Sequence, residues 1–126
     1  HSIKGGRAYD SHAYKKTDAE YEGLIVEAYD RRFYPEGYMR QYCAIVADCS
    51  RVERLGKISV PTLVIHGKDD NLVRVECGID TAKSVPGAQL ELIEGMGHDL
   101  PEALCPKFIE LIVGHARSSL ASVAAE

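Results

Sequence analysis

Two side chains of complementary chemistry each follow an apolar stretch of this chain: Asp70 comes after VPTLVIHG, and His98 comes after LELIEG. A carboxylate that accepts a hydrogen bond from one imidazole nitrogen fixes the tautomer of the ring. It also stabilises the imidazolium that forms when the other nitrogen takes a proton. If the fold brings Asp70 and His98 together, the pair is therefore a proton relay.

The apolar stretches have the features of neighbouring parallel strands. Residues 60–67 form a short run without alternation, which is typical of a strand buried on both faces. Residues 88–94 predict a second strand, and helices are predicted at about 75–84 and 102–116. The order strand, helix, strand, helix is a βαβ unit with a right-handed crossover expected. Because sites form beyond the carboxyl ends of parallel strands, the two loops are expected at one edge of the sheet.

The other histidines have structural interpretations. His66 stands at the end of the first strand, and His115 is expected to be a hydrogen-bonded core residue of the last helix. That helix carries one apolar face, formed by Leu104, Phe108, Leu111, Ile112 and His115. His1 and His12 carry no signal, and for His98 itself the alternative is a surface loop histidine.

The first half of the chain reads as helical or irregular. Thr17 and Glu20 form a capping box, which predicts a helix from about 18 to 31. Gly23 weakens this helix by about 1 kcal/mol relative to alanine. Pro35 suits the first turn of a second helix. The apolar stripe of that second helix is Met39, Tyr42, Cys43 and Val46.

All seven tyrosines lie in this first half and most of them could line one surface: Tyr9, Tyr14, Tyr21, Tyr29, Tyr34, Tyr38 and Tyr42. Aromatic stripes of this kind are usually core, so core packing is favoured over a wall that faces a ligand.

Composition excludes several classes of function. The chain has 126 residues, enough for one small domain, and a net charge of −4. Charges of both signs are mixed along it, which argues against a nucleic-acid surface.

The apolar runs of the chain are far shorter than the ~20 residues of a membrane span. The first residues lack the apolar core of a signal peptide. They also lack an initiator Met, which favours a processed or cut product.

The four cysteines, Cys43, Cys49, Cys77 and Cys105, include no Cys-x-x-Cys pair, which argues against a zinc site. Buried or free thiols are predicted, and with them a reducing compartment, the cytoplasm. Adjacent acids such as Asp69 and Asp70 are usually a solvated turn rather than a cation site. No metal or organic cofactor is therefore expected.

The segments RVERLGKISVPTLVIHGKDDNLV and VPGAQLELIEGMGHDLP together resemble the C-terminal part of α/β-hydrolase-fold enzymes of the esterase and lipase type. The resemblance covers residues 51–118, and YDRRFYPEG looks like part of the helical lid of these esterases. The implied fold class is α/β, the C-terminal βαβα part of a hydrolase sheet preceded by helical lid segments. Residues 1–56 would form the lid portion and 57–118 the core, with a frayed tail at 119–126.

The resemblance implies that Asp70 is the acid and His98 the base of a Ser–His–acid triad. Asp69 competes with Asp70 for the role of acid. In the family the acid commonly stands three residues after the glycine of the His-Gly pair, and from Gly67 that position is Asp70. Asn71 stands where relatives often have proline, which should not affect the chemistry.

The nucleophile of this family lies in Gly-x-Ser-x-Gly, at a strained turn from a strand to a helix. No serine or cysteine of this chain has glycine at both flanking positions; the serines are Ser2, Ser11, Ser50, Ser59, Ser84, Ser118, Ser119 and Ser122. The family order is nucleophile, acid, histidine, so the nucleophile and the oxyanion hole are expected upstream of residue 1. The isolated chain is therefore expected to be inactive.

The leading hypothesis is the C-terminal part of a serine hydrolase that cleaves a small, moderately lipophilic carboxylic ester. The alternatives within the fold are an epoxide hydrolase or a haloalkane dehalogenase, each with an aspartate nucleophile, and a carbon–carbon bond hydrolase. A different alternative is a non-catalytic assembly module. Two parallel strands do not form a stable sheet alone, so their edges would pair with an N-terminal half or a swapped copy.

Overall fold

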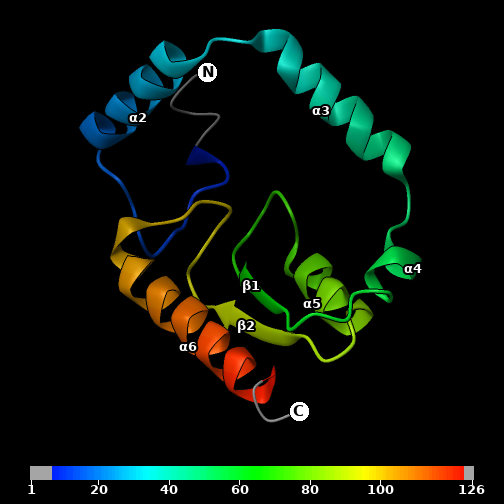
Figure 1. The fold of residues 1–126 in the computed structure, drawn as a ribbon. Coiled ribbons are helices and arrows are strands. Elements are labelled where there is room, and N and C mark those ends of the chain that lie inside the picture. Colours follow the sequence, from blue (N-terminus) through cyan, green and yellow to red (C-terminus); the bar gives the residue numbers. More distant parts are fainter. Residues whose placement is uncertain (1–6, 124–126) are drawn as a thin grey trace.

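The computed structural model describes residues 7–123, and helices and strands alternate in its C-terminal half (Figure 1). The two strands run parallel, in a register that pairs Leu63 with Gln89 and Gly67 with Ile93. The elements of this half are α4 (Val52–Leu55), β1 (Leu63–Gly67), α5 (Val75–Ser84), β2 (Gln89–Ile93), the short 3₁₀ helix η1 (Glu102–Leu104) and α6 (Cys105–Val123). The predicted order of strand, helix, strand, helix is confirmed.

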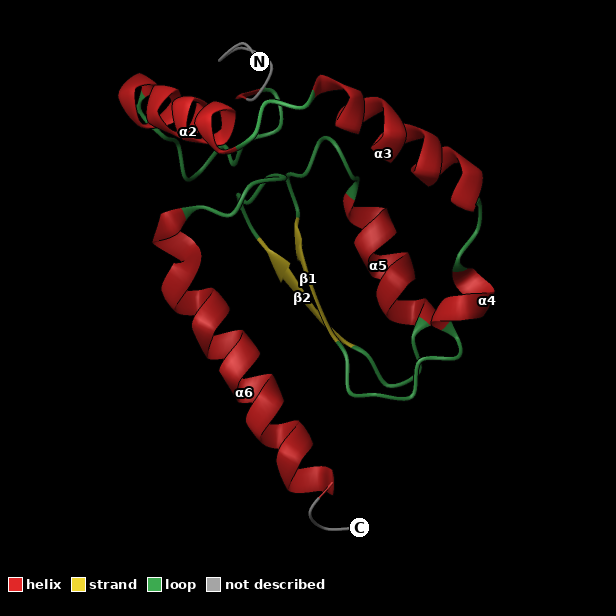
Figure 2. Ribbon diagram, turned by 45° about the horizontal axis from the view of Figure 1, so that its top comes forward, coloured by secondary structure: helices red, strands yellow, loops and turns green. Residues whose placement is uncertain are grey.

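Helices α5 and α6 lie on opposite sides of the two strands (Figure 2). Helix α5 packs directly on β1 and also contacts β2. Helix α6 is joined to β2 by an ion pair between Lys107 and Glu91, with Nζ 3.0 Å from Oε1. His115 adds a hydrogen bond from its Nδ1 to Oε1 of Gln89 at 3.2 Å. His115 is thus half-buried and hydrogen-bonded, close to the expected role.

The buried core is small and lies where β2 leads into α6. Ile93, Met96 and Leu104 form one cluster, and the partly buried side chains of Tyr14, Ile65 and Phe108 pack against it. Of the predicted apolar face of the last helix, Ile112 remains 56% exposed. The core therefore supports the start of α6 and the loop between β2 and α6, the loop that carries His98.

Strand β1 begins later and is less buried than predicted. It starts at Leu63 rather than at Val60, because Pro61 has no backbone N–H to donate to a ladder. Its residues from Leu63 to His66 are half-buried, and only Gly67 is buried. Strand β1 has one neighbouring strand, and one helix lies on each side of the sheet. These elements do not cover β1 completely.

Two further helices precede the sheet. Helix α2 (Asp18–Arg31) has the predicted bounds, and α3 (Pro35–Asp48) begins at the predicted proline. The predicted capping box is present: the Thr17 side chain accepts from the N–H of Glu20, and the Glu20 carboxylate accepts from the N–H of Thr17. Pro35 occupies the first turn of α3. Both helices follow an arc outside the sheet and its two flanking helices (Figure 1).

The prediction that the tyrosines pack in a core is wrong for most of them. Only Tyr14 and Tyr21 are half-buried. The predicted apolar stripe of α3 is exposed too, with Met39 at 56% and Val46 at 59%. The exposed tyrosines are Tyr9, Tyr29, Tyr34, Tyr38 and Tyr42. The reason is that no element within residues 7–123 packs extensively against α3.

Two smaller expectations also differ from the structure. All four cysteines are free, as one alternative predicted, but they are exposed rather than buried. Helix α6 continues to Val123, through most of the tail that was expected to fray, because the sequence SSLASV contains no Gly or Pro to end it. Residues 124–126 lie outside the described range.

No helix within the described residues is both long and apolar enough to cross a membrane.

Candidate active site

The structure brings Asp70 and His98 together beyond the carboxyl ends of the two strands. Strand β1 ends at Gly67 and β2 at Ile93, and because the strands are parallel their following loops meet at one edge. Nδ1 of His98 lies 2.8 Å from Oδ2 of Asp70. The predicted convergence of the two side chains is confirmed.

The carboxylate of Asp70 is almost fully enclosed, with 6% of the side chain exposed. Its Oδ1 accepts hydrogen bonds from the backbone N–H groups of Leu72 at 2.9 Å and Val73 at 2.8 Å, which closes a turn of the Asx type. Burial acts to raise the pKa of Asp70, but the hydrogen bonds from His98, Val73 and Leu72 outweigh it. They hold the pKa below its usual value, so the carboxylate is ionised at neutral pH.

The hydrogen bond to Asp70 determines which nitrogen of His98 carries the proton. An ionised carboxylate only accepts, so Nδ1 must donate, and in the neutral ring Nε2 is then the acceptor. The side chain of His98 is 44% exposed. The imidazole therefore has one nitrogen anchored and the other free to take a proton from a group outside the described contacts.

Asp69 and Asp70 have different surroundings. Asp69 contributes its backbone N–H, which donates to the carbonyl of Met96 at 3.0 Å and joins the two loops. The carboxylate that meets the imidazole is that of Asp70. Geometry therefore favours Asp70 as the acid partner.

His66 supports the loop that carries Asp70. Its Nε2 lies 2.8 Å from the carbonyl oxygen of Val73 and 3.6 Å from Oδ2 of Asp70, and only 13% of its side chain is exposed. A Cβ at position 78 would lie 2.6 Å from Cγ of the His66 ring, so Gly78 on α5 makes room for it. The arrangement agrees with the structural role expected for His66.

The two glycines before His98 have separate functions. Gly95 has a φ of 70°, the left-handed conformation that turns the chain sharply after β2. Gly97 allows a close backbone approach, because a Cβ there would lie 2.6 Å from the backbone carbon of Asp10. The Gly-x-Gly-His pattern thus combines a tight turn with a contact to the N-terminal segment.

Residues 9–13 run beside this loop, which the sequence did not predict. The N–H of His98 donates to the carbonyl of Tyr9 at 2.7 Å, and the N–H of Ala13 donates to the carbonyl of Gly95 at 3.3 Å. Between them, the N–H of Gly97 donates to Oγ of Ser11 at 2.9 Å. No motif in the sequence marks Ser11.

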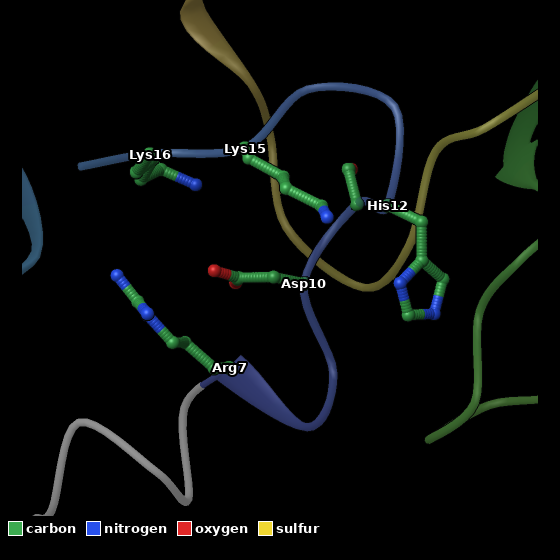
Figure 3. Close-up of a pocket in the computed structure, with 6 residues that line it drawn as sticks. Arg7, Asp10, His12, Lys15 and Lys16 are labelled. Atoms are coloured by element: carbon green, nitrogen blue, oxygen red, sulfur yellow. The ribbon is translucent and has the colours of Figure 1, made fainter. Parts of the chain in front are cut away.

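A hollow of about 230 Å³ lies on the N-terminal segment, apart from the Asp70–His98 pair. Figure 3 shows the side chains of Arg7, Lys15 and Lys16 gathered around the carboxylate of Asp10. Arg7 also pairs with Asp18, and Lys16 with Asp99, so these cations already have acidic partners.

A larger hollow, of about 1080 Å³, lies between α2 and residues 100–103, just after the histidine loop. Its lining mixes apolar and charged side chains, among them Tyr14, Leu24, Leu100, Lys16 and Glu102. Within the described residues, no group of three or more His, Cys, Asp and Glu side chains is placed to hold a metal ion.

Known hydrolases share sequence with this chain. Monoacylglycerol lipase ABHD6 of Rattus norvegicus is 34% identical over 79 residues, which are 60% of this chain and 23% of the lipase. A 2-hydroxy-6-oxononadienedioate/2-hydroxy-6-oxononatrienedioate hydrolase of Cupriavidus pinatubonensis is 42% identical over 45 residues, 36% of this chain and 16% of that enzyme. No family model matches the chain.

A solved structure shares the fold. The crystal structure of a His-tagged serine hydrolase involved in carbazole degradation, the CarC enzyme, matches with a TM-score of 0.63 and 22% identity. The match covers 91% of this chain and 45% of that one. The chain is thus related to the α/β-hydrolase-fold superfamily, as the resemblance predicted. It spans about a quarter or less of the length of the curated relatives named here.

Proposed function

We propose that this chain supplies the acid, Asp70, and the base, His98, of a serine hydrolase that cleaves a carboxylic ester. The observation that carries the proposal is the 2.8 Å hydrogen bond between Nδ1 of His98 and the nearly enclosed carboxylate of Asp70. This bond leaves Nε2 available as a proton acceptor.

In the proposed reaction, Nε2 of His98 takes the proton of a serine hydroxyl as the serine oxygen attacks the ester carbonyl. Asp70 stabilises the imidazolium, which then gives the proton to the departing alkoxide and releases an alcohol. A water molecule repeats the cycle on the acyl-enzyme and frees the acid. The sequence contains no Gly-x-Ser-x-Gly, so the proposal assigns the serine to polypeptide other than residues 1–126.

For the substrate we propose a small ester with a lipophilic group. The name of one relative, monoacylglycerol lipase, supports a lipophilic ester. The hollow beside the histidine loop, with Tyr14, Leu24 and Leu100 in its lining, offers apolar surface for such a group.

A chimaera tests the proposal. Residues 51–118 would replace the aligned segment of a complete monoacylglycerol lipase, and hydrolysis of a monoacylglycerol would be measured. We expect activity, with kcat lowered by about 10⁶-fold in the His98→Ala chimaera and by about 10⁴-fold in the Asp70→Asn chimaera. Asp69→Asn and His115→Gln are matched controls and should stay within a few-fold. Equal losses in Asp69→Asn and Asp70→Asn would contradict the assignment of the acid.

The chain alone provides the complementary test. With an activated ester such as p-nitrophenyl butyrate, we expect no turnover above that of the His98→Ala variant, because the triad acts as a unit. Substantial turnover that His98→Ala abolishes would mean that a nucleophile within residues 1–126 has been overlooked.

A second candidate is hydrolysis of a bond other than an ester. The relative named as a 2-hydroxy-6-oxononadienedioate/2-hydroxy-6-oxononatrienedioate hydrolase, 42% identical over 45 residues, favours it. An acid–histidine pair of this kind serves either reaction, so the same chimaera assayed with a monoacylglycerol and with that dienedioate would separate the two.

The remaining candidate is an assembly module. The sheet has two strands, and α3 exposes Tyr38 at 72% and Ile45 at 61%. We propose that these surfaces pair with an N-terminal hydrolase half or with a second copy; a stable folded monomer in size-exclusion chromatography would count against it.

The four free thiols support a cytoplasmic location, which alkylation of the thiols in intact cells would test.

A further inference from the structure

Ser11 is the most deeply enclosed side chain among the described residues, with 1% of its surface exposed. Its hydroxyl accepts from the N–H of Gly97 at 2.9 Å and donates to Oδ1 of Asp99. Its own N–H donates to the same oxygen at 2.8 Å. The single hydroxyl proton of Ser11 is used in the hydrogen bond to Asp99, and the hydroxyl oxygen already accepts one hydrogen bond. This buried serine therefore has a structural role and is not placed to act as a nucleophile.

The two partners of Ser11 are the residues on either side of His98. One hydroxyl thus connects the backbone before the histidine to the carboxylate after it. The backbone of His98 is held as well, through its N–H to the carbonyl of Tyr9 at 2.7 Å. Three consecutive residues of the loop are therefore tied to one short stretch, residues 9–11.

Asp99 completes the connection. Its Oδ2 pairs with the ammonium of Lys16, and both side chains are largely enclosed, at 16% and 21% exposed. Burial acts to raise the pKa of Asp99, but the hydrogen bonds from Lys16 and Ser11 outweigh it and keep the pKa below its usual value. An ionised carboxylate can only accept, which orients the Ser11 hydroxyl toward Asp99 and its lone pairs toward Gly97.

The imidazole of His98 needs such support because 44% of its own side chain is exposed. Its direction is set by the hydrogen bond to Asp70 and by the backbone from which it projects. Small displacements of a reacting group are costly in catalysis, so a fixed backbone here has a functional consequence.

We propose that Ser11 and Asp99 are positioning residues that hold the His98 backbone so that Nδ1 faces Asp70 and Nε2 faces the reacting group. The catalytic meaning of this arrangement rests on the function proposed above. The orientation of Nδ1 toward Asp70 does not depend on that function. It can be tested on the chain itself, through the ring nitrogen that carries the proton.

The test uses the 126-residue chain with ¹⁵N-labelled histidine at about pH 8, where an unperturbed imidazole is neutral. The ¹⁵N shifts of the His98 ring report which nitrogen carries the proton. In the unaltered chain we expect the Nδ1–H tautomer. In Ser11→Ala and Asp99→Ala we expect a shift toward Nε2–H, together with amide exchange of Gly97 and His98 that is up to about 10-fold faster.

Two variants make the test specific. Asp99→Asn keeps an oxygen for both Ser11 donors and should restore the Nδ1–H tautomer relative to Asp99→Ala. Ser84→Ala removes a hydroxyl on α5 that donates to the carbonyl of Asp80, away from the His98 loop, and should leave the ring unchanged. If Ser11→Ala does not fold, the Asp99→Ala and Asp99→Asn pair decides the question.

An unchanged tautomer and unchanged loop exchange in a folded Ser11→Ala or Asp99→Ala chain would overturn the inference. An inactive chimaera with the expected tautomer shifts would instead overturn the proposed function and leave the positioning role standing.

Discussion

The loop that carries His98 and helix α3 differ in what surrounds them. The loop is fastened by backbone hydrogen bonds to residues 9–13 on one side and to Asp69 on the other, above the buried side chains of Ile93 and Met96. Helix α3 has a favourable first turn at Pro35, but its apolar side chains, Tyr38 and Ile45 among them, are mostly exposed.

Helix α3 shows that a segment can form a helix without packing that helix against the rest of the chain. A local signal is enough to place the start of α3 at Pro35, whereas most helical stability in proteins comes from burying an apolar face. The free energy of unfolding should therefore depend on a few residues around the histidine loop and hardly at all on α3. The following substitutions test that division.

The largest effect should come from Ile93→Ala. Ile93 is 3% exposed in the core cluster, and the cavity should cost about 2–5 kcal/mol in the free energy of unfolding. Tyr38→Ala, at a side chain 72% exposed on α3, should change it by no more than about 0.5 kcal/mol. Urea denaturation measures both. Similar losses would show that α3 is packed in solution, against a partner or a second copy.

The next effect contrasts two glycines. A Cβ at Gly67 would collide with the backbone carbonyl of Met96, so Gly67→Ala should destabilise the chain by about 1–3 kcal/mol. A Cβ at Gly23 in α2 would meet nothing within 4 Å, and Gly23→Ala should stabilise the helix by up to about 1 kcal/mol. Thermal melts followed by circular dichroism would compare them; a loss at Gly23 would mean that its face is covered.

A smaller and more local effect is expected from the cap of α2. Thr17→Ala removes the side chain that accepts from the N–H of Glu20 and should cost about 1 kcal/mol of helix stability. Amide exchange in the first turn of α2 should quicken while that of α5 stays the same. Faster exchange in α5 as well would show that α2 and the sheet unfold together.

The smallest effect is a dependence on pH. The hydrogen bonds from Lys16 and Ser11 hold the pKa of Asp99 below its ordinary value in the folded chain, so at acid pH the unfolded chain binds more protons. The stability from the Lys16 pair is present above the unfolded pKa and is lost as the pH falls through the folded one. For this single, largely enclosed pair we expect about 0.5–1 kcal/mol. Urea midpoints from pH 7 to 3 should fall less steeply in Asp99→Asn; equal slopes would contradict the assignment.

What the sequence could predict depended on how far apart the signals lay. The capping box at Thr17 and the proline at position 35 are local signals. Helix α2 has the predicted bounds, and α3 begins at the predicted residue. Asp70 and His98 are distant, but each directly follows a predicted strand, and the parallel βαβ order places both loops at one edge.

Other features had no such signal. Ser11 is an ordinary serine in the sequence, and only the folded chain places it beside Asp99, 88 positions away. The exposed tyrosines were misjudged for a different reason. An apolar stripe predicts that one face of a helix is stabilised by packing against another element. It does not say whether that element belongs to this chain.

The separation between Ser11 and Asp99 has a consequence for the order of folding. Bringing together segments 88 positions apart closes a loop that contains most of the chain. The chain loses conformational entropy when this loop closes, and the contacts form only after that loss. The strands and α5 assemble from near neighbours and need no such closure. We therefore expect the contacts that fasten the His98 loop to residues 9–11 to form after the strands and α5 have assembled, and to be among the first lost when the protein begins to unfold.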